Sequence, residues 1–63
     1  MKIKIELDTA NDAFSDGNLC HEAARILHKL AERIERNGTL TPGDSMSFMD
    51  VNGNTVGFSK VTK

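Results

Sequence analysis

The chain has 63 residues, with eight lysines and arginines against nine aspartates and glutamates, so its formal net charge is −1. This balance lacks the broad positive field of a protein that binds nucleic acid through phosphates alone. A chain of this length forms a single domain, residues 1–63, whose small core yields little net stability, so we expect a homodimer. Its one cysteine, Cys20, excludes an internal disulfide and fits the reducing cytoplasm.

Residues 2–7 alternate charged and apolar side chains, which is the pattern of a half-buried β-strand. Ile3, Ile5 and Leu7 form its apolar side, while the charged side discourages pairing of a free strand edge with other strands. Charges interrupt the segment too often for a signal peptide or a membrane span. We therefore expect a cytoplasmic protein that does not bind membranes.

Residues 8–17 are rich in Asp, Asn, Ser and Gly and predict a loop. Phe14 is the only large apolar residue in this loop, and we expect it to cover one end of the core. Asn18 or Asp16 is suited to accept a hydrogen bond from the free N–H groups at the start of a following helix. The sequence thus predicts a side-chain N-cap at one of these two positions.

The segment 18–37 predicts an amphipathic helix, because its apolar residues recur at three- and four-residue spacing. Its opposite side is charged and predicts a solvated face, on which Glu22 and Arg25 are spaced to form an ion pair. Gly38 predicts the helix end, since glycine readily adopts the left-handed conformation of a C-cap. Residues 41–44, Thr-Pro-Gly-Asp, then predict a turn.

Two short segments rich in Ser, Met, Phe, Val and Thr flank an Asp-Val-Asn-Gly-Asn turn and predict a β-hairpin. With a three-residue loop at 51–53, Phe48 is expected to face Val56, and Met46 to face Phe58. This register places all but two of the large apolar residues on one side of the hairpin. The other side then carries small and mostly polar residues: Ser45, Ser47, Met49, Thr55, Gly57, Ser59 and Val61.

Together these elements predict an α+β domain in which one helix packs on one face of a three-stranded sheet, in the order strand, helix, strand, strand. Antiparallel pairing in the order 1-3-2 is preferred, and parallel pairing of the first two strands through a right-handed crossover is the alternative. The predicted core gathers apolar side chains from every element: Ile3, Ile5, Leu7, Phe14, Leu19, Ala23, Ile26, Leu27, Leu30, Ile34, Leu40, Met46, Phe48, Val56 and Phe58.

Possible metal ligands do not form a convincing set. The loop aspartates do not make an EF-hand, because Phe14 and Ala23 stand where that loop needs oxygen ligands. His21 and His28 are two helical turns apart and cannot bind one zinc ion. His28 and Glu32 have the spacing of two ligands, but no third ligand is indicated. We therefore expect no metal and no cofactor.

A nucleophilic site is not indicated either. Cys20 lies near the start of the predicted helix, where thiols can be activated. The adjacent His21 points about 100 degrees away around the helix, so the two do not form a nucleophile–base pair. No glycine-rich phosphate loop is present. We predict no catalytic residues and a protein that is not an enzyme.

Four stretches of the chain carry a resemblance to known proteins. The opening KIKIELDTANDAF, the helical AARIL and LAERIE of residues 23–27 and 30–35, and DVNGNTVG of residues 50–57 resemble a group of short phage and prophage proteins of unassigned function. The resemblance covers most of the chain and implies context only. Small phage accessory proteins often bind and block a host protein, as anti-CRISPR and other anti-defence inhibitors do.

The sheet face that the helix leaves open is the predicted surface for binding a host protein. Its candidate residues are Ser47, Met49, Thr55, Gly57, Ser59 and Val61. The alternative function is a small nucleic-acid-binding regulator, with contacts from Lys2, Lys4, Arg25, Lys29 and Arg33. Three phenylalanines and no Tyr or Trp offer little surface for base stacking, so nucleic acid is the less favoured partner.

Overall fold

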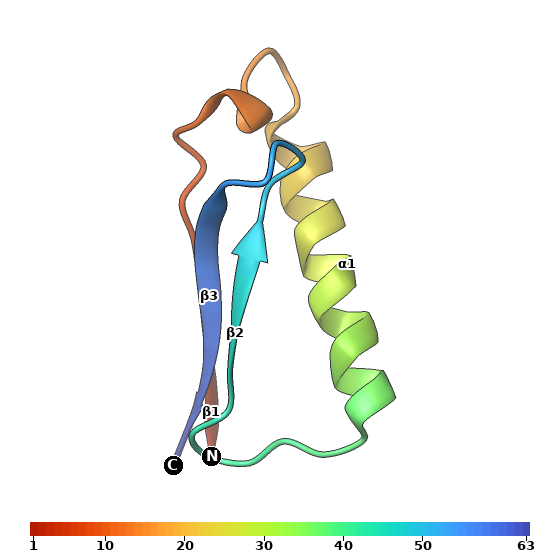
Figure 1. Ribbon diagram of the computed structural model, residues 1–63, viewed down its shortest axis with the longest axis vertical. Coiled ribbons are helices and arrows are strands. Elements are labelled where there is room, and N and C mark those ends of the chain that lie inside the picture. The colour runs from red at the N-terminus through yellow and green to blue at the C-terminus, as the bar shows by residue number, and fades with distance from the viewer.

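The computed structural model describes all residues, 1–63, as an α+β fold with one helix packed against a three-stranded antiparallel sheet (Figure 1). The sheet has the order β1-β3-β2, which confirms the predicted fold and excludes the parallel alternative. The elements are the strand β1 (Lys2–Leu7), the 3-10 helix η1 (Asp12–Phe14), the helix α1 (Leu19–Asn37) and the strands β2 (Ser45–Met49) and β3 (Thr55–Thr62).

The two ends of α1 differ in how they are capped. Gly38 has a φ of 75° and donates its N–H to the Ile34 carbonyl at 3.1 Å, which confirms the predicted C-cap. At the N-terminal end Asn18 is helical and its side chain makes no capping hydrogen bond, so the predicted side-chain N-cap is wrong. Asn11 instead caps η1, accepting the Ala13 N–H at 3.1 Å.

The β2–β3 hairpin has the predicted three-residue loop but a different register beyond it. The Asp50 N–H donates to the Asn54 carbonyl at 2.9 Å. One residue further from the loop the ladder shifts, because Met49 pairs with Thr55 whereas Phe48 pairs with Gly57. The extra residue on β3 makes this a β-bulge, in which two residues of one strand oppose one of the other. The predicted pairing of Phe48 with Val56 is therefore wrong.

The bulge reverses which β3 side chains face the helix. Met46 pairs with Ser59 rather than with Phe58. Ser59 and Val61 are buried, while Phe58 is 43% exposed on the other side of the sheet. Because side chains alternate along a strand, a single extra residue moves every later side chain to the opposite face.

Gly57 is required where β3 passes close to β1. A Cβ at this position would overlap the carbonyl oxygen of Glu6 and crowd the Cα of Leu7. Backbone atoms of a paired strand cannot give way as the end of a flexible side chain can. The sheet therefore admits only glycine here without a local rearrangement.

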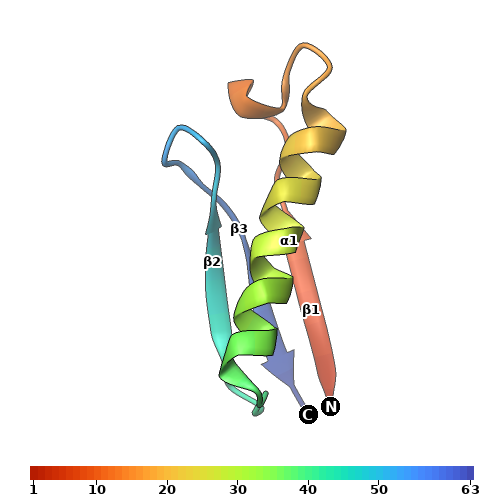
Figure 2. The same ribbon diagram turned by 90° about the vertical axis from the view of Figure 1, so that its right-hand side faces the viewer.

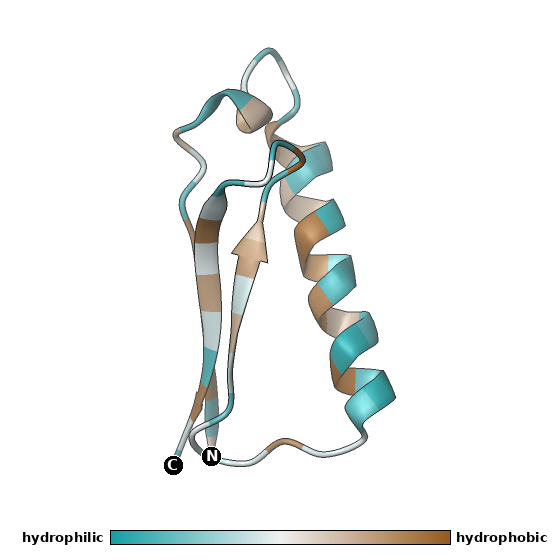
Figure 3. Ribbon diagram, in the orientation of Figure 1, coloured by the Kyte–Doolittle hydropathy of each residue, from teal (hydrophilic) through white to brown (hydrophobic).

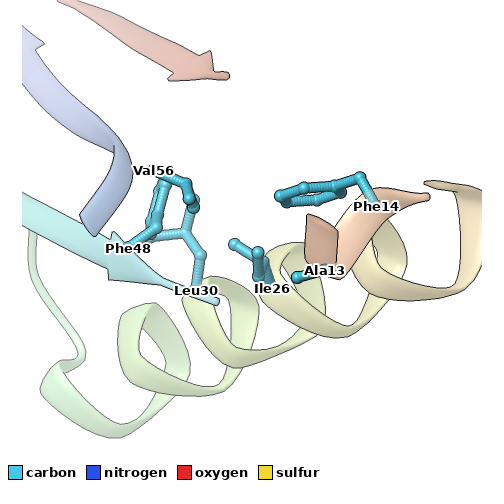
Figure 4. Close-up of a cluster of buried hydrophobic side chains, with 6 residues drawn as sticks. All are labelled: Ala13, Phe14, Ile26, Leu30, Phe48 and Val56. Carbon is cyan, nitrogen blue, oxygen red and sulfur yellow. The ribbon is translucent and has the colours of Figure 1, made fainter. Parts of the chain in front are cut away.

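The core lies between α1, η1 and the bulged part of the hairpin (Figure 4). Its buried apolar side chains are Ala13, Phe14, Ile26, Leu30, Phe48 and Val56, with Leu7, Ile34 and Met46 packed against them. Phe14 covers one end of this core, as predicted. Other residues predicted for the core are instead substantially exposed: Ile3, Ile5, Leu19, Leu27 and Phe58.

The exposure of the β1 isoleucines follows from the direction of the helix. Figure 2 shows α1 crossing the sheet obliquely, from the end of β1 toward the start of β2. Ile3 and Ile5 face the helix layer but remain 46% and 49% exposed. The hydrophobic bands of α1 face the sheet and its hydrophilic bands face away (Figure 3). The molecule is elongated, with extents of 37 × 19 × 18 Å.

Candidate binding surface

The side of the sheet turned away from α1 is uncovered, and we call it the open face. Residues directly opposite each other in an antiparallel pair share a face, so the register assigns its members. The open face consists of Lys2, Lys4 and Glu6 from β1, Ser45, Ser47 and Met49 from β2, and Thr55, Phe58, Lys60 and Thr62 from β3. Four of these side chains are short and polar and four are charged, and all of the residues except Thr62 are exposed.

Two apolar side chains and a pair of lysines distinguish the open face. Phe58, on the central strand, is 43% exposed between Glu6 and Ser47, and Met49 is 59% exposed. Lys4 lies directly opposite Lys60. Like charges in this position destabilise a sheet, and an acidic group placed between them would relieve the repulsion. The face thus combines an apolar centre with a net positive charge.

The structure divides the six predicted interface residues between the two faces. Ser47, Met49 and Thr55 lie on the open face, as predicted. The placement of the other three is wrong because of the bulge: Gly57, Ser59 and Val61 face the helix. Ser59 and Val61 are buried, and Gly57 lies against the backbone of β1. Phe58 takes their place on the open face.

The positively charged residues predicted for nucleic-acid binding are not brought together. Lys2 and Lys4 lie on the open face, whereas the helix residues lie beside β2. Lys29 and Arg33 line a hollow of about 280 Å³ between α1 and β2. Arg25 is engaged in an ion pair with Glu22 at 2.6 Å. The structure therefore offers two separate basic surfaces rather than one.

A polar cluster that the sequence did not reveal fastens the hairpin loop to α1 and η1; it consists of Asn11, Glu22, Arg25, Asp50 and Asn54. Glu22 is only 3% exposed. It accepts hydrogen bonds from Arg25 Nε at 2.6 Å and Nη2 at 2.9 Å, and from the Val51 N–H at 2.9 Å. The predicted pairing of Glu22 with Arg25 is therefore present, but Glu22 is buried instead of lying on a solvated face.

Asp50 forms the other half of the polar cluster and is 5% exposed. Its carboxylate accepts the N–H groups of Asn52 at 2.9 Å and Asn54 at 2.8 Å, together with the side-chain amides of Asn11 at 2.7 Å and Asn54 at 3.3 Å. The Asp-x-Asn-x-Asn spacing of the loop is a signal for the local bonds, because Asp commonly accepts from N–H groups just ahead of it. No local signal indicates Asn11.

The hydrogen bonds keep both acids ionised. The Arg25 guanidinium lowers the pKa of Glu22 below its ordinary value of 4.5, although partial desolvation acts in the opposite direction. For Asp50 the largest single influence is desolvation, which raises the pKa. The hydrogen bonds from Asn54, Asn11 and Asn52 together outweigh it, so the pKa of Asp50 is lowered overall. Asp50 accepts four hydrogen bonds and Glu22 accepts three, which suits these carboxylates to hold the fold rather than to exchange protons.

The remaining reactive side chains do not form a constellation. No group of three or more His, Cys, Asp or Glu residues is placed to hold a metal ion. Cys20 is a free, exposed thiol. The one long helix, α1, carries charged residues throughout and has no apolar stretch that could span a bilayer.

Comparison with known proteins leaves the open face to be interpreted from its own chemistry. No protein-family model matches the chain, and searches of curated proteins and of solved structures find no significant match.

Proposed function

We propose that this protein is a non-enzymatic binding protein whose open face covers a surface of another protein. The observation that carries the proposal is the exposure of Phe58 and Met49 on a face of otherwise small polar side chains and lysines. Aromatic residues and methionine are enriched in protein interfaces, where a few such anchors provide most of the binding energy. Short flanking side chains allow a partner to approach closely.

The net positive charge of the open face indicates the charge of the partner surface that it would bind. Lys2, Lys4 and Lys60 outnumber the single acid, Glu6, so the complementary surface is acidic around an apolar contact for Phe58. The resemblance to short phage proteins supports a host protein in the bacterial cytoplasm as the partner. Occupation of its surface would inhibit it, as an anti-defence factor requires, without any chemistry by this chain.

We also propose that the chain acts as a homodimer. A monomer of its mass typically exposes about 4,000 Å², whereas this chain exposes 4611 Å². Its radius of gyration is 12.4 Å, against about 10.6 Å for a compact domain of this length. This extra surface supports a second chain as a regular partner.

Nucleic-acid binding is the second candidate function, and a specific observation favours it. Lys4 and Lys60 are direct neighbours on the open face, and the exposed Phe58 lies two residues before Lys60 on the same face of β3. A phosphate could bind between the lysines while a base stacks on the ring. Nucleic-acid binding of this kind would weaken as the salt concentration rises. It would have only one aromatic side chain, Phe58, for base stacking.

Affinity capture from a bacterial host lysate tests the proposed function. We expect the wild-type chain to retain a protein that Phe58→Ser loses. Leu27→Ser is the matched control, because Leu27 is similarly exposed, at 41%, but lies on α1. Equal capture by all three chains would contradict a role for the open face.

A gel-shift assay at low salt separates the second candidate from the first. Binding of an oligonucleotide that weakens with salt and with Lys60→Ala would assign the open face to nucleic acid. Absence of any shift would leave protein binding as the function of this face.

A further inference from the structure

β1 forms a free edge of the sheet and offers unpaired hydrogen-bonding groups along it. The Asp8 N–H donates to the Val56 carbonyl at 2.7 Å, in register with the pairing of β1 and β3. Hydrogen-bonded positions alternate along an antiparallel ladder, so every second residue counted back from Asp8 bonds to β3. The residues between them, Ile3, Ile5 and Leu7, direct their N–H and C=O groups to the free edge.

The two edges of the sheet are treated differently by α1. On the β2 edge Arg25 donates to the Met49 carbonyl at 3.4 Å, and Lys29 and Arg33 lie alongside. α1 slants away from the start of β1, where Ile3 and Ile5 remain about half exposed (Figure 2). The free backbone groups and the exposed isoleucines therefore lie along the same edge.

The charges along β1 are complementary to those of a second, antiparallel copy of the same strand that is centred on Ile5. Lys4 and Glu6 lie one residue to either side, and Lys2 and Asp8 lie three residues to either side. In an antiparallel pair of two copies centred on Ile5, Lys4 of each copy faces Glu6 of the other. Lys2 likewise faces Asp8, so the four positions make only opposite-charge pairs.

We propose that two copies of the chain join along their β1 edges, antiparallel and with the two-fold axis at Ile5, to form one continuous six-stranded sheet. On the helix side Ile5 packs against its counterpart, and Ile3 packs against Leu7 of the second copy. The N–H and C=O groups of these three residues supply the backbone hydrogen bonds of the interface.

The same charges explain why this edge selects its own copy. Charged side chains discourage a strand edge from pairing with most other strands. In the proposed register they attract, and Lys4, which faces Lys60 within the chain, gains an acidic neighbour. A register centred on Lys4 would instead place Lys4 of one copy against Lys4 of the other.

The inference rests on the homodimer proposed above, and charge reversal tests it by light scattering over a dilution series. Lys4→Glu and Glu6→Lys each replace two attractive contacts by two repulsive ones at exposed positions, which the monomer fold tolerates. We expect each variant to dimerise about tenfold or more weakly than the wild type. Circular dichroism confirms that both remain folded.

An equimolar mixture of the two variants tests whether opposite charges at these positions restore dimerisation. In a mixed pair the Lys4→Glu chain opposes two lysines of the Glu6→Lys chain at these positions, so attraction is restored. We expect dimers of wild-type affinity in the mixture, and also in the chain that carries both substitutions.

Two outcomes would overturn the inference. A monomeric wild-type chain throughout the dilution series would remove the homodimer itself. A wild-type dimer that neither charge reversal weakens would overturn the pairing of the β1 edges but not the homodimer. If Met49→Asp dissociates that dimer, its contact lies on the open face. The first result leaves capture of a host protein through Phe58 unaffected, whereas in the second, with the contact on the open face, a host protein and the second copy would compete for that face.

Discussion

The two faces of the sheet are built from the same three strands, but α1 covers one of them and leaves the other exposed. On the covered face Ile26 and Leu30 of α1 pack against Phe48 and Val56, and the polar cluster fastens the hairpin loop beside them. On the open face Phe58 is 43% exposed, and no helix covers that side of the sheet (Figure 1). The comparison shows that the contacts which stabilise the fold lie on the covered face, so the exposed residues of the open face are not needed for the core.

The largest expected effect is on the covered face, from Ile26→Ala. Ile26 is 2% exposed at the centre of the core. Removing a buried isoleucine side chain costs about 2–5 kcal/mol of unfolding free energy, as much as a domain of this size has. Circular dichroism and denaturant titration should find a chain that is largely unfolded. A cost below about 1 kcal/mol would contradict the assigned core.

Gly57→Ala is expected to have the next largest effect. Its methyl group would overlap the Glu6 carbonyl oxygen on the neighbouring strand. Overpacking of this kind costs about 1–3 kcal/mol, measured as a lower midpoint of chemical unfolding. Thr55→Ala, an exposed change on the same strand, is the control and should shift the midpoint little. Equal midpoints for the two variants would show that β1 and β3 are not in this register.

Asp50→Ala should destabilise the hairpin end of the covered face. The change leaves the N–H groups of Asn52 and Asn54 and the side chain of Asn11 without their acceptor. We expect a lower thermal unfolding midpoint, whereas Asp44→Ala, in the exposed turn at the other end of the hairpin, should lower it less. A larger decrease in the midpoint for Asp44→Ala than for Asp50→Ala would contradict a stabilising role of the polar cluster.

Acid should destabilise the fold through the same cluster. Glu22 and Asp50 have lowered pKa values, so the stability they provide is complete above their ordinary values of 4.5 and 3.8. It is lost as the pH falls through the lower values of the folded state. Thermal midpoints should therefore decline below about pH 4.5, and Glu22→Gln should flatten that decline. An unchanged profile in the variant would contradict this assignment.

The smallest effect on stability is expected from Phe58→Ser on the open face. Its ring contacts no covering layer, so we expect a change within about 0.5 kcal/mol in unfolding free energy. The same substitution should abolish partner capture. A loss of stability comparable to that of Ile26→Ala would instead make Phe58 part of the core.

Most of the fold could be predicted because its signals are local. The helical spacing of Ile26 and Leu30, the alternation of residues 2–7 and the glycine at position 38 each indicate one element. The predicted side-chain N-cap was wrong because Asn18 has helical backbone angles, with φ −87° and ψ −2°, and its side chain makes no capping hydrogen bond. The Asp50 loop carried a recognisable turn pattern, but its bond to Asn11 joins positions far apart in sequence.

The candidate site was only half predictable, and the bulge at Val56 is the reason. Gly57 is the one local signal, because a glycine inside a strand pattern is typical of a bulge or of a close backbone approach, but it does not fix the register. The extra residue then exchanges the faces of all later β3 side chains. Ser59 and Val61 were therefore placed outside and Phe58 inside. The close contact that excludes a side chain at Gly57 depends on β1, which the hairpin sequence alone does not contain.

The most direct test of the binding proposal is a footprint of the captured partner by two-dimensional NMR on the isotope-labelled chain. We expect the largest amide shifts at Ser47, Met49, Phe58 and Lys60, with little change at Glu32 or Arg36 on the outer side of α1. Shifts concentrated on α1, with the open face unchanged, would contradict it.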